Sequence, residues 1–130
     1  MFRFVKALNG NAQADVHLLK CGSNTFYVLG EALVCTGGTA TSPSATTAPD
    51  YIALTRNYTT HHKKLDAIVV TENSVFKVEY TGNMTPYVGM PVGLATYMSK
   101  IDAVTYNTNG KGTVLGVSDD GKYVYVRFRK

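Results

Sequence analysis

The chain has 130 residues, enough for one domain that closes a hydrophobic core without a disulfide or a metal ion. Only 17% of the residues are charged, and the net charge of +4, from 13 basic and 9 acidic residues, is well below that of a dedicated nucleic-acid coat protein. No apolar stretch is long enough for a membrane-spanning helix and residues 1–10 lack the apolar core of a signal peptide, so we expect a cytoplasmic chain.

Short strands are expected from the start of the chain. "FRFVKAL" (residues 2–8) and "DVHLLK" (residues 15–20) each suit a strand or an extended segment. The chain is therefore predicted to be a single β domain, 1–130, in which residues 1–20 are either an extended N-terminal arm or part of the sheet. "FYVLGEALVCTGG" (residues 26–38) predicts two short β segments around Gly30.

"GGTATSPSATTAPDYIAL" (residues 37–54) reads either as a linker between two domains or as a loop within one. A linker would leave a first piece of about 36 residues, too small to hold a core of its own. The flanking sequences are both strand-like. We therefore predict a long, exposed and mobile loop that returns the chain to the same sheet system.

The middle of the chain continues the β pattern. "DYIALT" predicts a strand with Ile52 and Leu54 on one face, and "DAIVV" is a short apolar run bounded by turn residues. In "SVFKVEYTG", Val75, Lys77 and Glu79 alternate with Phe76, Val78 and Tyr80. "GLATYMSK" (residues 93–100) is the one plausible helical turn, and "IDAVTYNT" (residues 101–108) is one more strand.

The C-terminus predicts a β-hairpin over Thr113–Val117 and Lys122–Arg129, joined by the turn "SDDG". Its second strand places Val124, Val126 and Phe128 on one face, and Tyr123, Tyr125, Arg127 and Arg129 on the other. The predicted fold class is all-β: a small barrel or sandwich of short antiparallel strands, with the long Thr/Ser/Ala/Pro loop and little or no helix.

Metal and redox chemistry are weakly indicated. His61 and His62, with His17, Cys21 and Cys35, are the available ligands, but adjacent residues on a strand point to opposite faces and no metal-binding spacing is present. We predict no metal and no cofactor. The two cysteines are interpreted as buried small hydrophobic residues rather than a disulfide.

Catalysis is not indicated either. The sequence has no G-x-S-x-G motif and no phosphate-binding loop, and neither cysteine has a plausible base nearby in sequence. The carboxylates are scattered. Several of them, Asp50, Asp66, Asp119 and Asp120, are expected at turns, where they bond to the backbone. We predict that the protein is not an enzyme.

"GKYVYVRF" (residues 121–128) indicates an alternative function. A basic residue and spaced aromatics precede an arginine, as on strands that bind single-stranded nucleic acid. In this interpretation the protein is a small β-barrel whose Tyr123 and Tyr125 stack on bases while Arg127 and Arg129 contact phosphates. An ordinary amphipathic strand with solvated Tyr and Arg side chains explains the same pattern.

Three stretches carry a resemblance to a known family: "LGEALVCTGGTATSPSATTAPDYIALT", "AIVVTENSVFKVEYTGNMTPYVGMPVGL" and "GTVLGVSDDGKYVYVRFRK". Together they resemble the capsid decoration (cement, or auxiliary head) proteins of tailed bacteriophages and prophages. The matching positions are Gly30, Ala32, Leu33, Pro49, Tyr51, Ile52, Ala53, Leu54, Gly89, Gly93, Leu94, Gly116, Val117, Gly121, Val124, Val126 and Phe128.

The resemblance implies a non-enzymatic virion protein that binds the outside of a capsid and stabilises the expanded shell. It implies the major capsid protein as partner, no membrane, and a place on the capsid exterior after assembly in the host cytoplasm; a homotrimer and a monomer both fit. The predicted capsid contacts are Phe2, Arg3, Phe4, Val5 and Lys6, unless these residues form an ordinary first strand. A second candidate contact is the loop with Tyr58, His61, His62, Lys63 and Lys64, for which a solvated loop is the alternative.

Overall fold

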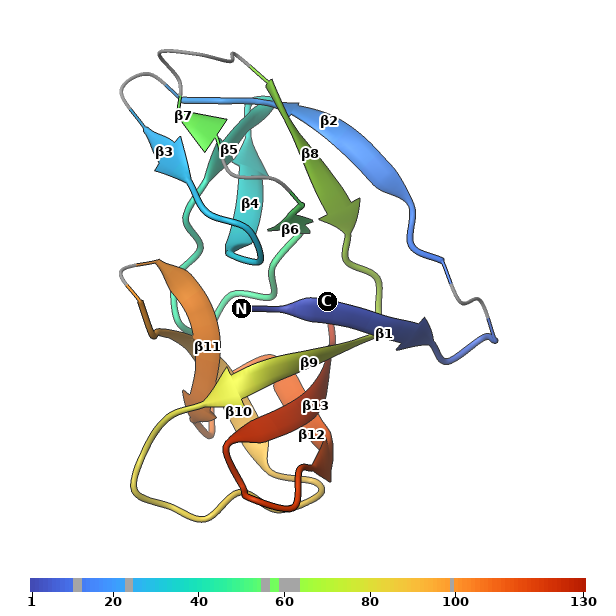
Figure 1. Cartoon of the computed structure of the whole chain (residues 1–130), viewed down its shortest axis with the longest axis vertical. Helices are drawn as coiled ribbons and strands as arrows, with labels where there is room; N and C mark the ends of the chain where they lie inside the picture. Colours follow the sequence, from blue (N-terminus) through green and yellow to red (C-terminus); the bar gives the residue numbers. More distant parts are fainter. Residues whose placement is uncertain (11–12, 23–24, 55–56, 59–63, 99) are drawn as a thin grey trace.

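The structure, a computed structural model, describes residues 1–10, 13–22, 25–54, 57–58, 64–98 and 100–130, with the backbone alone at 57–58. It confirms the all-β prediction: these residues form thirteen strands and no helix (Figure 1). A helix of the length and apolar character needed to cross a membrane is likewise absent from the described residues.

The first half of the chain forms a closed five-stranded barrel, drawn in the upper part of Figure 1. Its strand order is β2 (Val16–Lys20), β5 (Thr39–Thr41), β4 (Ala32–Thr36), β6 (Tyr51–Ala53) and β8 (Lys64–Val69), and β8 pairs with β2 to close it. A separate two-stranded sheet joins β3 (Phe26–Tyr27) to β7 (Asn57–Tyr58). The interior of this barrel is filled by Leu19, Cys21, Tyr27, Leu33, Ala40, Ala53, Leu65 and Ala67.

The five strands of the second half join the first strand of the chain in a six-stranded sheet that closes on itself. Its order is β1 (Arg3–Ala7), β9 (Ser74–Tyr80), β11 (Ile101–Tyr106), β10 (Pro91–Thr96), β12 (Gly112–Val117) and β13 (Tyr123–Phe128). An additional β9–β13 pairing turns the last five strands into a ring. On its other edge β9 pairs first with β1 and then, in parallel, with β11. Because it has three neighbours, β9 is the strand on which this half is organised.

The C-terminal hairpin is confirmed, and its alternation decides which side chains face inward. Val124, Val126 and Phe128 are buried, whereas Tyr123 and Tyr125 remain partly exposed. The turn is closed by Asp120, whose Oδ1 accepts hydrogen bonds from Ser118 Oγ (2.6 Å) and the Lys122 N–H (3.0 Å). The bond from Ser118 and the bond from the Lys122 amide hold the pKa of the Asp120 carboxyl below its usual value.

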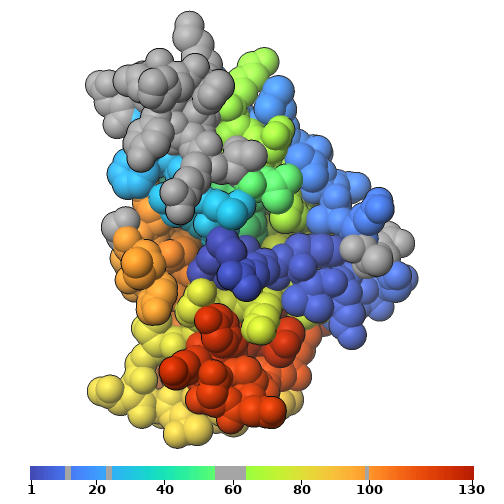
Figure 2. Space-filling model, in the orientation of Figure 1, coloured from blue at the N-terminus to red at the C-terminus, as the bar shows by residue number. Residues whose placement is uncertain are grey.

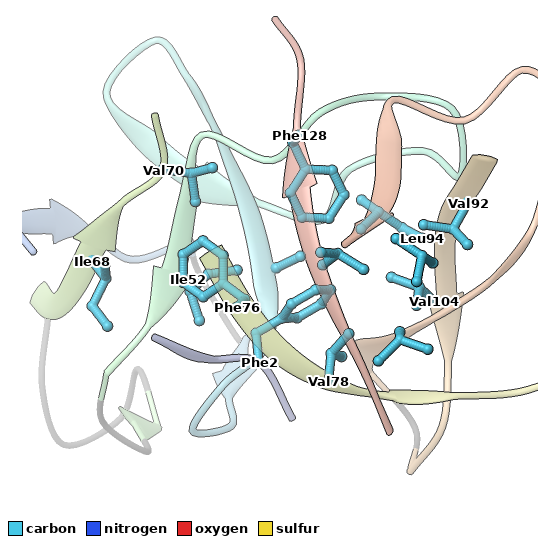
Figure 3. Close-up of a cluster of buried hydrophobic side chains, with 14 of the residues drawn as sticks. Phe2, Ile52, Ile68, Val70, Phe76, Val78, Val92, Leu94, Val104 and Phe128 are labelled. Atoms are coloured by element: carbon cyan, nitrogen blue, oxygen red, sulfur yellow. The ribbon is translucent and has the colours of Figure 1, made fainter. Parts of the chain in front are cut away.

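A second core fills the interior of the six-stranded sheet and extends to the first barrel. Figure 3 shows Phe2, Phe76 and Phe128 gathered within it. The Phe2 ring centroid lies 6.2 Å from that of Phe76, edge to face, and 5.9 Å from that of Phe128. Ala32, Ile52, Ile68 and Val70 reach this core from the first half of the chain. The two barrels are therefore packed through one continuous set of apolar side chains.

The described part of residues 1–20 holds two paired strands and is not an extended arm, because β1 pairs with β9 and β2 pairs with β8. Phe2 is only 3% exposed, so its prediction as a capsid contact is wrong: the ring belongs to the shared core. Its N–H donates to the Gly30 carbonyl (2.9 Å). Gly30 has φ +81°, and a Cβ there would lie 1.9 Å from Met1 Cγ, so only glycine lets the N-terminus lie this close.

The Thr/Ser/Ala/Pro stretch does return the chain to the same barrel, since β4, β5 and β6 are neighbours there. The predicted exposure is confirmed at residues 41–42 and 44–47, but the stretch also makes contacts with the rest of the fold. The stretch contains β5, Pro43 and Pro49 are buried, and the Ala45 carbonyl accepts a hydrogen bond from the Leu94 N–H of β10 (2.9 Å). A Cβ at Gly93 would lie 2.6 Å from that carbonyl oxygen, so glycine permits this contact between the barrels.

Three local predictions fail. The expected helical turn at residues 93–100 is largely β10, because cross-strand pairing with β11 prevails over a short local helical preference. Leu54 lies beyond the end of β6 and is exposed, whereas Ile52 is buried, so the two do not share a buried face. Asp66 lies within β8 and not at a turn.

Replacing Phe2 by alanine should lower the free energy of unfolding by about 3–5 kcal/mol, because it removes an aromatic ring from a packed core. Val5→Ala, three residues further along the chain but 41% exposed, is the matched control and should change stability by about 0.5 kcal/mol or less. Urea denaturation of both variants measures this. Equal stability of the two variants would contradict the position of Phe2 in the core.

Candidate interaction surface on the second barrel

The outward side of β1, β9, β12 and β13 forms one continuous surface, which we call the outer face. Cross-strand pairing sets its rows: Arg3 lies opposite Lys77, Lys77 opposite Tyr125, and Tyr125 opposite Gly116. Figure 2 shows β1 (blue), part of β9 (yellow-green) and β13 (red) on the same side of the molecule. The outer face is thus assembled from the two ends of the chain, with β9 between them.

An apolar hollow of about 420 Å³ lies on the outer face. It is lined by Val5, Lys6, Leu8, Val75, Leu115, Gly116 and Tyr125. Val75 points to the outward side of β9 yet is only 2% exposed, and it belongs to neither core, so it is covered by the other lining residues. The exposed fractions of Val5, Leu8 and Leu115 are 41%, 47% and 38%. The hollow therefore presents apolar side chains to solvent on ordered strands.

Four cations lie on the outer face, and one of them, Lys6, lines the hollow. Arg3, Lys6, Lys77 and Arg127 lie on β1, β9 and β13, and within the described part of the chain none of them forms an ion pair. Glu79 is the only carboxylate in the four strands, and it is paired with the N-terminal ammonium of Met1. That ammonium also donates to the Asp102 carbonyl (2.6 Å). The outer face consequently has an excess of positive charge.

The aromatic side chains of the outer face are already partly covered. Lys77 Nζ lies 4.9 Å from the centroid of the Tyr123 ring, a cation–π contact. The Tyr125 ring packs against Gly116, with Cδ2 at 3.4 Å from the position of a Cβ there. Both rings are held in place, and neither is a fully open stacking platform.

The structure brings together two sets of residues that the sequence treated separately. Arg3, Val5 and Lys6, predicted as capsid contacts, share the outer face with Tyr123, Tyr125 and Arg127, predicted as an alternative nucleic-acid face. Phe4 is half-buried, with its ring 5.9 Å from that of Phe76, and packs against the shared core. Arg129 is exposed beyond the end of β13 and donates to the Gly110 carbonyl (3.3 Å).

Two members of the second predicted contact loop, Tyr58 and Lys64, lie in described strands. Tyr58 is in β7, and Lys64 is exposed at the start of β8. His61, His62 and Lys63 lie outside the described residues. The described members of this set are on strands other than those of the outer face.

The remaining candidate ligands do not converge in the described residues: no three His, Cys, Asp or Glu side chains there are grouped to hold a metal ion. Cys21 and Cys35 are both unbridged, the first buried and the second partly buried. His17 Nδ1 lies 3.0 Å from Tyr51 Oη and its ring packs beside that tyrosine. These side chains have structural contacts in the first barrel.

Glu31 is a buried carboxyl group that the sequence did not single out. It is fully buried at the start of β4; Oε1 accepts from the Val28 N–H (2.9 Å), whereas Oε2 has no partner within the described residues. Burial is the main cause that raises the pKa of this carboxyl, and nearby Asp102 adds to it. The Val28 N–H and the charge of Lys100 act in the opposite direction.

Sequence reasoning missed Val75, Lys77, Leu8 and Leu115 as parts of the outer face. The alternation in "SVFKVEY" did place Val75 and Lys77 on one side of a strand. It could not show that β1 and β13 would be the neighbours of that strand, because such pairing is long-range.

Comparison of the sequence with protein-family models and with curated proteins gave no match. The geometry of the outer face and the resemblance noted above are therefore the basis for a functional proposal.

Glu31→Gln should stabilise the protein relative to the wild type as pH rises. Because the pKa of Glu31 is raised in the folded state, the protonated carboxyl contributes its full stability at pH values below the pKa of glutamate in the unfolded chain, about 4.3. That contribution is lost as the pH rises through the pKa of Glu31 in the folded state, because a buried charge must then form. Glutamine is neutral at every pH, so thermal unfolding between pH 4 and 8 should show a gap that widens with pH in favour of the variant.

Asp120→Asn is the control of opposite sign, because the pKa of Asp120 is lowered in the folded state. Its ionised form stabilises the turn above the unfolded pKa, and this contribution is lost as pH falls. The variant should therefore be less stable than the wild type at neutral pH and approach it in acid. A gap for Glu31→Gln that does not change with pH would contradict the account of Glu31.

Proposed function

We propose that this protein is a non-enzymatic structural protein of a tailed-phage virion, which binds the outside of the capsid and stabilises the expanded shell. The observation that carries the proposal is the outer face: an apolar hollow within an excess of positive charge, on ordered strands. The resemblance to decoration proteins along most of the chain supports the same function. The partner is the major capsid protein, and the protein lies on the capsid exterior after assembly in the host cytoplasm.

The body of the molecule suits this task. The two barrels share a core, and Lys130 Nζ adds a bond to the Pro49 carbonyl (2.7 Å) that joins the end of the chain to the loop before β6. A rigid body loses little conformational entropy on binding. Each copy that contacts two neighbouring capsid subunits links them, and repetition over many sites lets a modest affinity stabilise the whole shell. Monomeric and homotrimeric binding are both compatible with one outer face per chain.

The use of the carboxylates supports a non-enzymatic role. Asp102 Oδ1 accepts from the Tyr97 N–H (2.8 Å) and the Met98 N–H (3.3 Å), which fixes the β10–β11 turn. Asp120 closes the hairpin turn, and Glu79 is paired with the N-terminus. These groups serve the backbone and are not grouped around a common reacting atom.

A single-stranded nucleic-acid binder is the second candidate. The observation in its favour is that Tyr123, Tyr125 and Arg127 share the outer face with Lys77. Base stacking requires accessible aromatic faces. The contacts of Lys77 with Tyr123 and of Gly116 with Tyr125 reduce that access, which makes this the weaker proposal.

The purified protein should cosediment with expanded heads of the phage that encodes it, and not with unexpanded proheads. Binding should weaken as the salt concentration rises, because exposed cations contribute to the contact. Bovine serum albumin in place of the protein controls for trapping in the pellet. Equal binding to heads and proheads, or no binding to either, would refute the decoration function.

A further inference from the structure

We propose that the hollow on the outer face holds an apolar side chain from an extended, acidic segment of the capsid protein. This inference rests on the proposed function and specifies its partner. Its basis is the juxtaposition of an apolar hollow with four cations that have no ion-pair partner in the described part of the chain.

The hollow has the properties of an anchor site. Its volume of about 420 Å³ is at the lower end for small-ligand clefts, which is enough for one large aliphatic or aromatic side chain. Val5, Leu8 and Leu115 supply exposed apolar walls, and Val75 is covered beneath them. A buried apolar anchor in such a site commonly supplies a large share of the binding energy of an interface.

The positive charges of the outer face favour acidic residues on either side of the anchor side chain. Lys6 lines the hollow. Lys77 and Arg127 each lie two residues along their strand from a lining residue, Val75 on β9 and Tyr125 on β13, and Arg3 lies opposite Lys77. Glu79, the only carboxylate in these strands, is already paired with Met1. Carboxylates that flank the anchor residue would therefore meet cations that have no ion-pair partner among the described residues, and basic segments would be repelled.

Two other occupants fit less well. A second copy of this chain in a twofold contact would place the same four cations against themselves, because a twofold interface pairs a patch with itself. Nucleic acid would satisfy the cations, but it would leave the aliphatic walls without an apolar partner, and the two tyrosine rings are partly covered. An acidic peptide segment with an apolar side chain satisfies both features.

The test compares two matched pairs of variants for cosedimentation with expanded heads. Leu115→Glu places a charge in the hollow, and Leu18→Glu makes the same change at a leucine that is 60% exposed on β2. Lys6→Glu reverses a charge beside the hollow, and Lys20→Glu reverses an exposed charge on β2. Thermal unfolding of all four variants verifies that each is folded before binding is compared.

Leu115→Glu and Lys6→Glu should each weaken binding about tenfold or more, which corresponds to about 1.4 kcal/mol, whereas Leu18→Glu and Lys20→Glu should stay within about twofold of the wild type. The dependence of binding on salt should also become shallower in Lys6→Glu. Heads that bind the wild type and Leu115→Glu equally would overturn this inference and leave the proposed function standing. Heads that do not bind the wild type would overturn the proposed function, and the inference with it.

A 20-nucleotide oligothymidine provides the remaining arm. It should bind at least about tenfold more weakly than expanded heads. Oligothymidine that binds as tightly as heads, with a loss of binding in both Leu115→Glu and Lys6→Glu, would assign the outer face to nucleic acid and overturn the inference.

Discussion

The buried ring of Phe2 joins the two barrels and sets the position of the first strand. Its ring meets Phe76 and Phe128 of the second barrel in a core that Ile52 and Ile68 enter from the first. Since β1 begins one residue later, fixing this ring also fixes the position of β1 on the edge of β9. The N-terminal segment therefore connects the two barrels, and its exposed side chains are part of the outer face.

The pairing of β9 with β1 and β13 assembles the outer face. One edge of β9 pairs with β1 and β11, and the other edge pairs with β13. The first and last strands of the chain therefore lie on opposite sides of β9, whose outward residues include Val75 and Lys77. Inward residues of these strands fill the shared core, and outward residues form the outer face. The division follows from the two-residue period of a strand, because a shift of one residue would exchange the two sets.

The outer face combines two properties that favour the binding of another macromolecule. Its apolar hollow is costly to leave in water, and its cations form no ion pair with a carboxylate of the described residues. A rigid double barrel presents both without a large entropic cost on binding. The buried Glu31 lies directly before β4 and does not line the hollow.

Alternation along a strand and turn residues such as Asp-Gly act locally, so the all-β class, most of the strands and the inward side of the C-terminal hairpin could be predicted from the residues alone. The same alternation placed Val75 with Lys77, and Tyr123 with Tyr125, on single strand sides. No local pattern predicted that Phe2 is buried, that the Thr/Ser/Ala/Pro stretch contacts β10, or that Arg3 lies in one row with Lys77 and Tyr125. These contacts join residues far apart in the chain, and strand pairing over such separations is set by packing of the whole core, which no local pattern encodes.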